Sequence, residues 1–208
     1  MGSKNLKAVA VRGRKGVAVA DPEAFMAAVK QGKETLAAHP VTGEGLPTFG
    51  TQILMNILNE AGGLPSKNAQ DVRFEGAGAI SGEAMKKPRA TDGKANLVTN
   101  HACFGCTIAC GRISTVDQGH FTVKNKPEYW GASGGLEYEA AWALGSDTGV
   151  DDLDALTYVN FLCNEDGMDP ISFGATVAAA MELFEAGAIT TEHTGGIDLS
   201  FKRCNRAI

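Results

Sequence analysis

The segment from His101 to Arg112 carries most of the information in this sequence. It reads His101-Ala-Cys103-Phe-Gly-Cys106-Thr-Ile-Ala-Cys110-Gly111-Arg112. Two residues separate the first two cysteines and three separate the next pair, so the three thiolates can turn toward one point. Gly105 and Gly111 let the backbone approach closely and supply N–H groups to sulfur. In a reducing compartment this crowding predicts a metal site rather than disulfides.

Three interpretations of the cysteine segment are open from the residues alone. A cubane iron–sulfur cluster commonly takes three cysteines from one short segment and a fourth from far away. Tetrahedral zinc more often takes two and two, or adds a histidine. The thiols could also be small buried apolar groups without a metal. The spacing and the glycines favour a [4Fe-4S] cluster, with His101 as a polar neighbour rather than a ligand.

Outward from this segment the chain is mainly helical. At Asp21-Pro22-Glu23 a good N-cap precedes a proline at the first helical position and an acidic first turn. Apolar residues then recur at helical spacing. The predicted helices are Pro22–His39, Thr48–Ala61, Ser81–Lys87, Leu136–Leu144, Asp151–Asn164 and Pro170–Ala186.

Strands are expected in two places. Leu6–Arg12 and Val17–Ala20 are apolar and β-branched, and the Gly13–Gly16 turn separates them, so they predict a short β annex at the N-terminus. A second hairpin is predicted over Arg112–Lys126, with its turn at 117–120. The expected fold class is therefore mainly α with a short β annex at the N-terminus, α+β overall.

Composition narrows the function classes. The chain has 208 residues, of which 44 % are hydrophobic, enough to bury a real core. Its net charge of −5 is opposite in sign to the positive charge that proteins use to bind phosphate backbones. We therefore expect no nucleic-acid partner. No apolar run approaches the roughly 20 residues of a membrane-spanning helix, and the start lacks the apolar core of a secretory signal. A cytoplasmic protein without a membrane partner is expected.

The remaining cysteines do not extend the metal site. Cys163 lies inside a predicted helix and is expected in the core. Cys204 lies in the tail Lys202-Arg-Cys-Asn-Arg206, and we do not assign it as a ligand.

Several stretches together resemble the aldehyde:ferredoxin oxidoreductase family, the tungsten and sometimes molybdenum bis-pterin enzymes. The resemblance extends in order over essentially the whole chain and is weakest between residues 40 and 100. It rests on the N-terminal stretch Met1–Gly13, the cysteine segment, Leu136-Glu-Tyr-Glu139, Leu144-Gly-Ser146, Gly149-Val-Asp-Asp152 and Asn164-Glu-Asp-Gly-Met-Asp-Pro-Ile-Ser172.

The resemblance implies a domain organisation. Family members have an N-terminal β domain that cradles two pterins, followed by two helical domains. Residues 1–20 then look like the terminal strands of the first domain, and residues 21–208 like the helical domain that carries the cysteines. The chain is thus expected to be a fragment, inactive alone, with its fourth cluster ligand outside this sequence.

The resemblance also implies an activity. The full-length protein is expected to oxidise a small aldehyde to a carboxylic acid at a tungsten (or molybdenum) bis-pterin. Electrons would leave through a [4Fe-4S] cluster on Cys103, Cys106 and Cys110 to ferredoxin or to an iron–sulfur or flavin subunit. Similar tungsten enzymes act on other substrates, such as aromatic thioesters. An oligomer is compatible with the sequence.

Five further residues match positions with roles in the family. The Glu137-Tyr-Glu139 match implies a carboxylate near the metal, with Glu139 favoured, that takes up the proton released when the aldehyde becomes an acid. The match over residues 164–169 implies that Asn164, Gly167 and Asp169 contact a pterin. From local sequence alone, the two glutamates could equally be solvated at a helix start, and residues 164–169 could simply be a helix C-cap followed by an N-cap.

Overall fold

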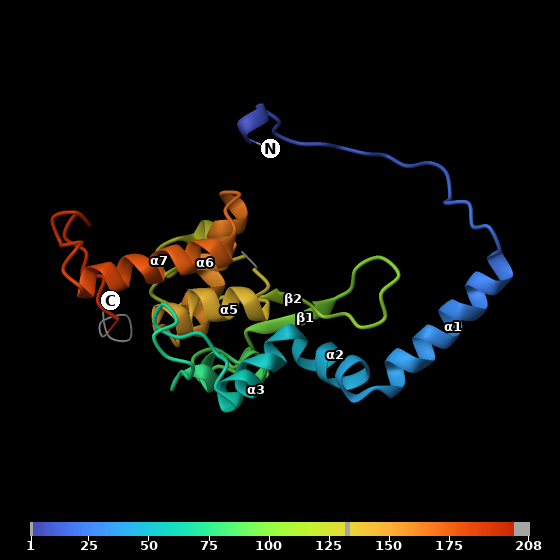
Figure 1. Cartoon of the computed structure of the whole chain (residues 1–208), viewed down its shortest axis with the longest axis horizontal. Coiled ribbons are helices and arrows are strands. Elements are labelled where there is room, and N and C mark those ends of the chain that lie inside the picture. The colour runs from blue at the N-terminus through green and yellow to red at the C-terminus, as the bar shows by residue number, and fades with distance from the viewer. Residues whose placement is uncertain (1, 132–133, 202–208) are drawn as a thin grey trace. The chain divides into compact units, whose positions relative to one another are not determined.

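The computed structural model describes residues 2–131 and 134–201. Its ordered elements are predominantly helical, which confirms that part of the predicted fold class (Figure 1). The longer helices are α1 (Pro22–Ala38), α3 (Leu54–Ala61), α5 (Tyr138–Leu144), α6 (Leu153–Glu165) and α7 (Pro170–Glu185). The shorter ones are α2 (Leu46–Phe49) and α4 (Gly82–Lys86), together with a π-helical turn at Val41–Gly45 and 3-10 turns at Gly2–Lys4, Gly50–Ile53, Ala77–Ile80, Pro127–Tyr129 and Ser146–Thr148.

The chain divides into two units, Met1–Thr35 and Leu36–Ile208. The first unit contains the 3-10 turn, an irregular stretch and most of α1. The predicted helix at Pro22 is confirmed: the Asp21 carboxylate accepts a hydrogen bond from the Ala24 backbone N–H at 3.0 Å and so caps its start. No residue of α1 is buried, and its apolar residues Phe25 and Met26 are exposed.

The predicted N-terminal strands are wrong. Residues 6–20 form no strand, and β-branched side chains such as Val11 and Val17 are exposed. A strand is held by backbone hydrogen bonds to a neighbour, and the described residues offer this segment no such partner. The β-branched pattern favours an extended backbone but cannot supply the second strand.

Caps and glycines set the helices of the second unit. Asp152 and Asp169 accept backbone N–H bonds at the starts of α6 and α7, and Ser81 does so for α4. The helix predicted over 48–61 is interrupted, because Gly50 adopts φ +62° and separates α2 from the turn that leads into α3.

The core of the second unit lies beneath α3, α4 and α5. Twelve buried residues form it: Met55, Leu64, Phe74, Ala77, Ile80, Met85, Leu136, Tyr138, Ala140, Ala141, Leu144 and Leu156. Helix α5 also packs against α7, closely enough that a Cβ at Gly174 would meet the carbonyl group of Ala143. The buried helix α5 thereby fixes the position of Glu137, which immediately precedes it.

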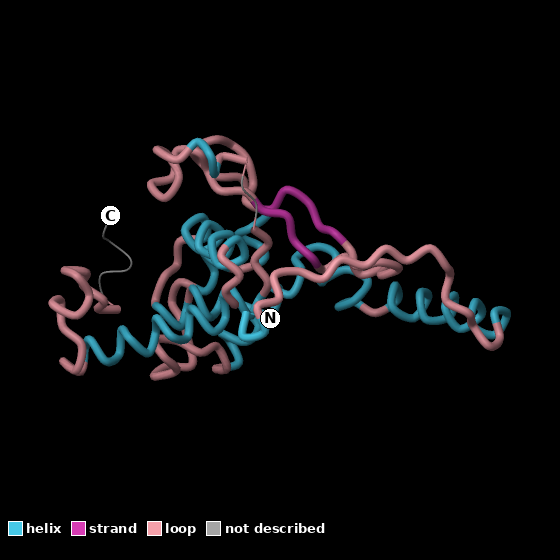
Figure 2. Tube along the Cα trace, turned by 90° about the horizontal axis from the view of Figure 1, so that it is seen from above, coloured by secondary structure: helices cyan, strands magenta, loops and turns pink. Residues whose placement is uncertain are grey.

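The sheet is a single two-stranded antiparallel hairpin in the described chain, shown in magenta in Figure 2. Strand β1 (Leu97–His101) pairs with β2 (Gly111–Ser114), with Asn100 opposite Arg112 and a bulge near Val98. The predicted hairpin over 112–126 is therefore wrong, since β2 pairs backward along the chain. Residues 117–126 instead form successive turns, in which Val123 and Lys124 donate backbone hydrogen bonds to the His120 carbonyl.

No described helix is long and apolar enough to cross a membrane.

Candidate metal centre

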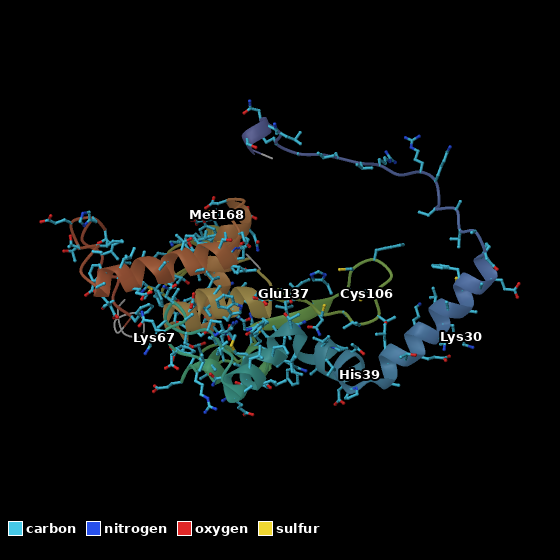
Figure 3. All side chains as sticks on the ribbon, viewed as in Figure 1. Lys30, His39, Lys67, Cys106, Glu137 and Met168 are labelled. Atoms are coloured by element: carbon cyan, nitrogen blue, oxygen red, sulfur yellow. The ribbon has the colours of Figure 1, made fainter. Side chains whose placement is uncertain are left out.

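The three clustered cysteines lie on one loop, residues 102–110, which joins the two strands of the hairpin. Cys103 and Cys106 are exposed, Cys110 is partly buried, and all three are free thiols. Figure 3 places Cys106 in this loop, beyond the ends of the strands. The hairpin thus brings the three predicted ligands onto a single turn of chain and presents them at the surface of their unit.

The loop backbone contains two residues at positive φ and donates a hydrogen bond to a cysteine sulfur. Gly105 and Ala109 adopt positive φ angles of 73° and 54°. The Cys106 backbone N–H donates to the Cys103 carbonyl at 3.0 Å, and the Ile108 N–H donates to the Cys106 Sγ at 3.4 Å. Hydrogen bonds from Ile108 and then Ala109 lower the pKa of the Cys106 thiol, so the loop favours the thiolate that a metal requires.

Within residues 2–131 and 134–201, no three His, Cys, Asp or Glu side chains lie close enough together to hold a metal. The thiols therefore share a loop without converging on one point. The donor chemistry nevertheless fits a cubane cluster: three free thiols on one exposed loop and peptide N–H groups directed at sulfur are the elements that iron–sulfur ligation uses.

Arg112 is the feature of this region to which the sequence assigned no role. Its side chain is 4 % exposed, and its Nη1 donates to Asn100 Oδ1 and to the Gly111 carbonyl, both at 2.9 Å. A Cβ at Gly50 would overlap the guanidinium, so glycine is required there. Burial lowers the pKa of Arg112, while the charges of Glu137 and Cys110 act in the opposite direction. A signal was available, because Arg112 follows the third clustered cysteine by only two residues.

The two predicted carboxylates make separate contacts. Glu137 immediately precedes α5 and is partly buried, and its Oε2 accepts a hydrogen bond from the Thr51 hydroxyl at 2.5 Å. Figure 3 shows it near the end of α5 that adjoins the hairpin. Glu139 lies in the first turn of α5, is exposed, and accepts a hydrogen bond from Trp142 Nε1. Of the two, Glu137 is the one that faces the buried Arg112, and a role for either near the metal stays a prediction.

The predicted pterin contacts form the connection between α6 and α7. Asn164 lies near the end of α6, and Gly167 adopts φ +69° after it. Asp169 caps α7, accepting hydrogen bonds from the Ser172 backbone N–H at 2.9 Å and from its hydroxyl at 2.6 Å. These bonds from Ser172 lower the pKa of Asp169. All three residues are exposed and do not lie on the cysteine hairpin, so their pterin role stays a prediction.

The two remaining cysteines differ in status. Cys163 is 1 % exposed, which confirms its place in the core, and burial raises the pKa of its thiol. Cys204 lies outside the described residues.

Comparison with known proteins gives the family. Residues 27–208 match the family model described as aldehyde ferredoxin oxidoreductase, domains 2 & 3. The chain is 44 % identical over 196 residues to a tungsten-containing aldehyde ferredoxin oxidoreductase of Pyrococcus abyssi, and 43 % identical over 195 residues to that of Thermococcus kodakarensis.

Each of these matches covers 94 % of this chain but 29 % of the relative's length. A further relative, the aliphatic sulfonate oxidoreductase, WOR-like subunit, of Pyrococcus furiosus, is 29 % identical over 45 % of this chain. The predicted division into residues 1–20 and 21–208 stays a prediction. The match over residues 27–208 is sufficient to conclude that this chain belongs to the aldehyde ferredoxin oxidoreductase family.

Proposed function

We propose that the full-length protein oxidises an aldehyde to a carboxylic acid at a tungsten, or molybdenum, bis-pterin. The support is the 44 % identity to enzymes named as tungsten-containing aldehyde ferredoxin oxidoreductases. In the overall reaction, aldehyde and water give the carboxylic acid, two protons and two electrons. When bound, the pterin metal would supply the redox chemistry. The protein would bind and orient the substrate and exclude water.

The observation that carries the electron-transfer part of the proposal is the cysteine loop. Cys103, Cys106 and Cys110 would hold a [4Fe-4S] cluster together with a fourth ligand from elsewhere. Such a cluster would supply one-electron transfer, so each aldehyde oxidised would require two transfers to ferredoxin or to an iron–sulfur or flavin subunit. The exposure of Cys103 and Cys106 in the described chain leaves this loop accessible to the rest of the protein or to a partner.

The proposed residue roles follow from the match of residues 137–139 and 164–169 to positions of the family. Glu139, with Glu137 as its neighbour, would accept the proton released at the substrate, and Asn164, Gly167 and Asp169 would contact the pterin. Asn164 can both donate and accept hydrogen bonds, whereas the ionised Asp169 accepts only. Both side chains are exposed, although Asp169 Oδ2 also accepts the hydrogen bonds that cap α7.

The second candidate function is oxidoreduction of a different substrate by the same kind of pterin metal and cluster. The sulfonate-oxidoreductase relative shows that proteins similar to part of this chain carry names other than aldehyde oxidoreductase. A related substrate such as an aromatic thioester would use the same cluster.

Metal analysis and turnover test the proposal together. The full-length protein, purified without oxygen, should contain tungsten or molybdenum and about four irons per chain. Oxidation of simple aldehydes with a viologen dye then separates the aldehyde activity from the alternative substrates. Zinc alone would instead indicate a metal-binding module without pterin, and the proposed function would fail.

A further inference from the structure

Arg112 carries two guanidinium donors that no acceptor uses. Among the described residues, Nε and Nη2 have no hydrogen-bond partner, although the side chain is 4 % exposed. A buried polar group left unpaired retains its full desolvation penalty, and a buried charge does so to a greater degree. Native proteins rarely keep such groups unless something else supplies the acceptor.

The nearby carboxylate does not supply that acceptor. Glu137 is close enough to act on Arg112 through its charge, but its Oε2 takes the Thr51 hydroxyl, and Arg112 Nε and Nη2 remain unpaired. Nη1 is already committed to Asn100 and the Gly111 carbonyl. These two bonds, together with the close packing of Gly50, fix the guanidinium rather than leaving it to find a partner.

The iron–sulfur cluster proposed for the cysteine loop is an anionic group that could accept these hydrogen bonds. Cys110 ends the cysteine loop and Arg112 is the second residue of β2, so the two are close neighbours along the chain, and their charges interact. A cubane on cysteine thiolates is itself anionic and becomes more so when it gains an electron. A fixed positive charge beside the cysteine loop stabilises the reduced form more than the oxidised form.

We propose that Arg112 is a positioning residue for the cluster, whose buried charge and two unused N–H donors raise the reduction potential of the iron–sulfur centre held by Cys103, Cys106 and Cys110. The step concerned is gain of one electron by the oxidised cluster and its later loss to a one-electron acceptor, with no bond made or broken. This inference rests on the proposed function, since it requires that the loop hold a cluster.

The test uses Arg112→Gln in the full-length protein, with Arg73→Gln as the matched control. Arg73 donates to the Glu60 carbonyl, away from the hairpin, so its substitution removes the same charge elsewhere. Both proteins are purified without oxygen, their iron is measured, and the cluster is titrated with redox mediators and followed by electron paramagnetic resonance.

We expect Arg112→Gln to keep its iron and to be harder to reduce. At a fixed potential its ratio of reduced to oxidised cluster should fall about tenfold, which corresponds to a midpoint about 59 mV lower for a one-electron couple. Arg73→Gln should titrate like the unsubstituted protein. An unchanged midpoint in Arg112→Gln with full iron overturns the inference.

Arg112→Lys decides the matter if the glutamine variant fails to fold. Lysine keeps the charge but not the planar fork of donors, so its midpoint should lie measurably below that of the unsubstituted protein. A lysine variant that retains iron and titrates like the unsubstituted protein shows that the donors are not used, and it also overturns the inference. Absence of iron in the unsubstituted protein is a different result, because it refutes the proposed function itself.

Discussion

At the scale of single residues, the contact between His120 and Asp152 joins the 117–126 turns to the start of α6. His120 Nε2 lies 3.0 Å from Asp152 Oδ2. Burial disfavours the charged imidazole, but the hydrogen bond and charge of Asp152 outweigh burial and raise the pKa of His120. Burial likewise opposes ionisation of Asp152, yet its bonds to His120 and Ala155 lower the pKa of Asp152.

The pH range in which this contact stabilises the fold follows from the raised pKa of His120 and the lowered pKa of Asp152. The contribution of His120 is fully present below its ordinary pKa of 6.5 and is lost as the pH rises through its raised pKa. The contribution of Asp152 is present above its ordinary 3.8 and is lost as the pH falls through its lowered pKa. The contact should therefore stabilise most in mildly acidic solution.

His120→Gln tests this window. Near pH 5 the substitution should cost about 1 kcal/mol locally, a modest value because Asp152 is partly solvated. Backbone amides of residues 119–124 should then exchange hydrogen about fivefold faster than in the unsubstituted protein at the same pH. The difference should shrink above neutral pH. Equal exchange in the two proteins near pH 5 would show that the ion pair stabilises nothing.

Gly50 is the residue whose backbone and surroundings both exclude a side chain. Gly50→Ala places a Cβ at φ +62° and into the Arg112 guanidinium. Gly93→Ala is the matched control, since Gly93 has φ +71° with open space around it. Both substitutions place a side chain at positive φ, and at Gly50 the ψ of −160° makes this backbone conformation essentially exclusive to glycine. Only Gly50→Ala also displaces Arg112. Urea unfolding should show Gly50→Ala as the less stable of the two; equal losses would mean that Arg112 moves without cost.

At the scale of elements, the sequence predicted the helix caps but not the pairing of the strands. Asp21, Asp152 and Asp169 cap the helices that they were expected to begin, because a cap depends only on residues within one turn. The interruption at Gly50 was missed, and the close packing of Arg112 against Gly50 involves a residue distant in the sequence. The partner of β2 was also missed, since strand pairing is a non-local choice that alternation alone does not make.

The site shows the same division. Three cysteines at close spacing predicted their common loop, whereas the convergence of Thr51, Glu137 and Arg112 comes from three segments that only the fold brings together. Burial of Cys163 was predictable from its place in an apolar helix. The exposure of Glu139 in this chain was not, because it depends on what packs against α5.

The junction between α6 and α7 offers a test that separates capping from cofactor binding. Asparagine caps a helix about as well as aspartate, so Asp169→Asn should leave thermal stability nearly unchanged. It loses the carboxylate that the proposed pterin contact uses, and we expect the tungsten or molybdenum content of the full-length protein to fall. A variant that keeps both its stability and its metal would show that Asp169 acts only as a helix cap.

At the scale of the whole molecule, the chain corresponds to one part of its longer relatives. It spans 29 % of the length of its tungsten-containing relatives, and in the proposed cluster its three cysteines would be joined by a fourth ligand. In the described residues, Glu137 before α5 and Cys110 at the end of the cysteine loop both lie close enough to Arg112 for their charges to act on it.

The most direct measurement is the electron paramagnetic resonance spectrum of the full-length protein reduced without oxygen, with Cys106→Ala and Cys163→Ala as paired variants. The account predicts a reduced-cubane signal in the unsubstituted protein and in Cys163→Ala, whose thiol is buried in the core. The signal and the iron should be lost in Cys106→Ala. An unsubstituted protein without iron, or a Cys106→Ala variant with an unchanged signal, would contradict it.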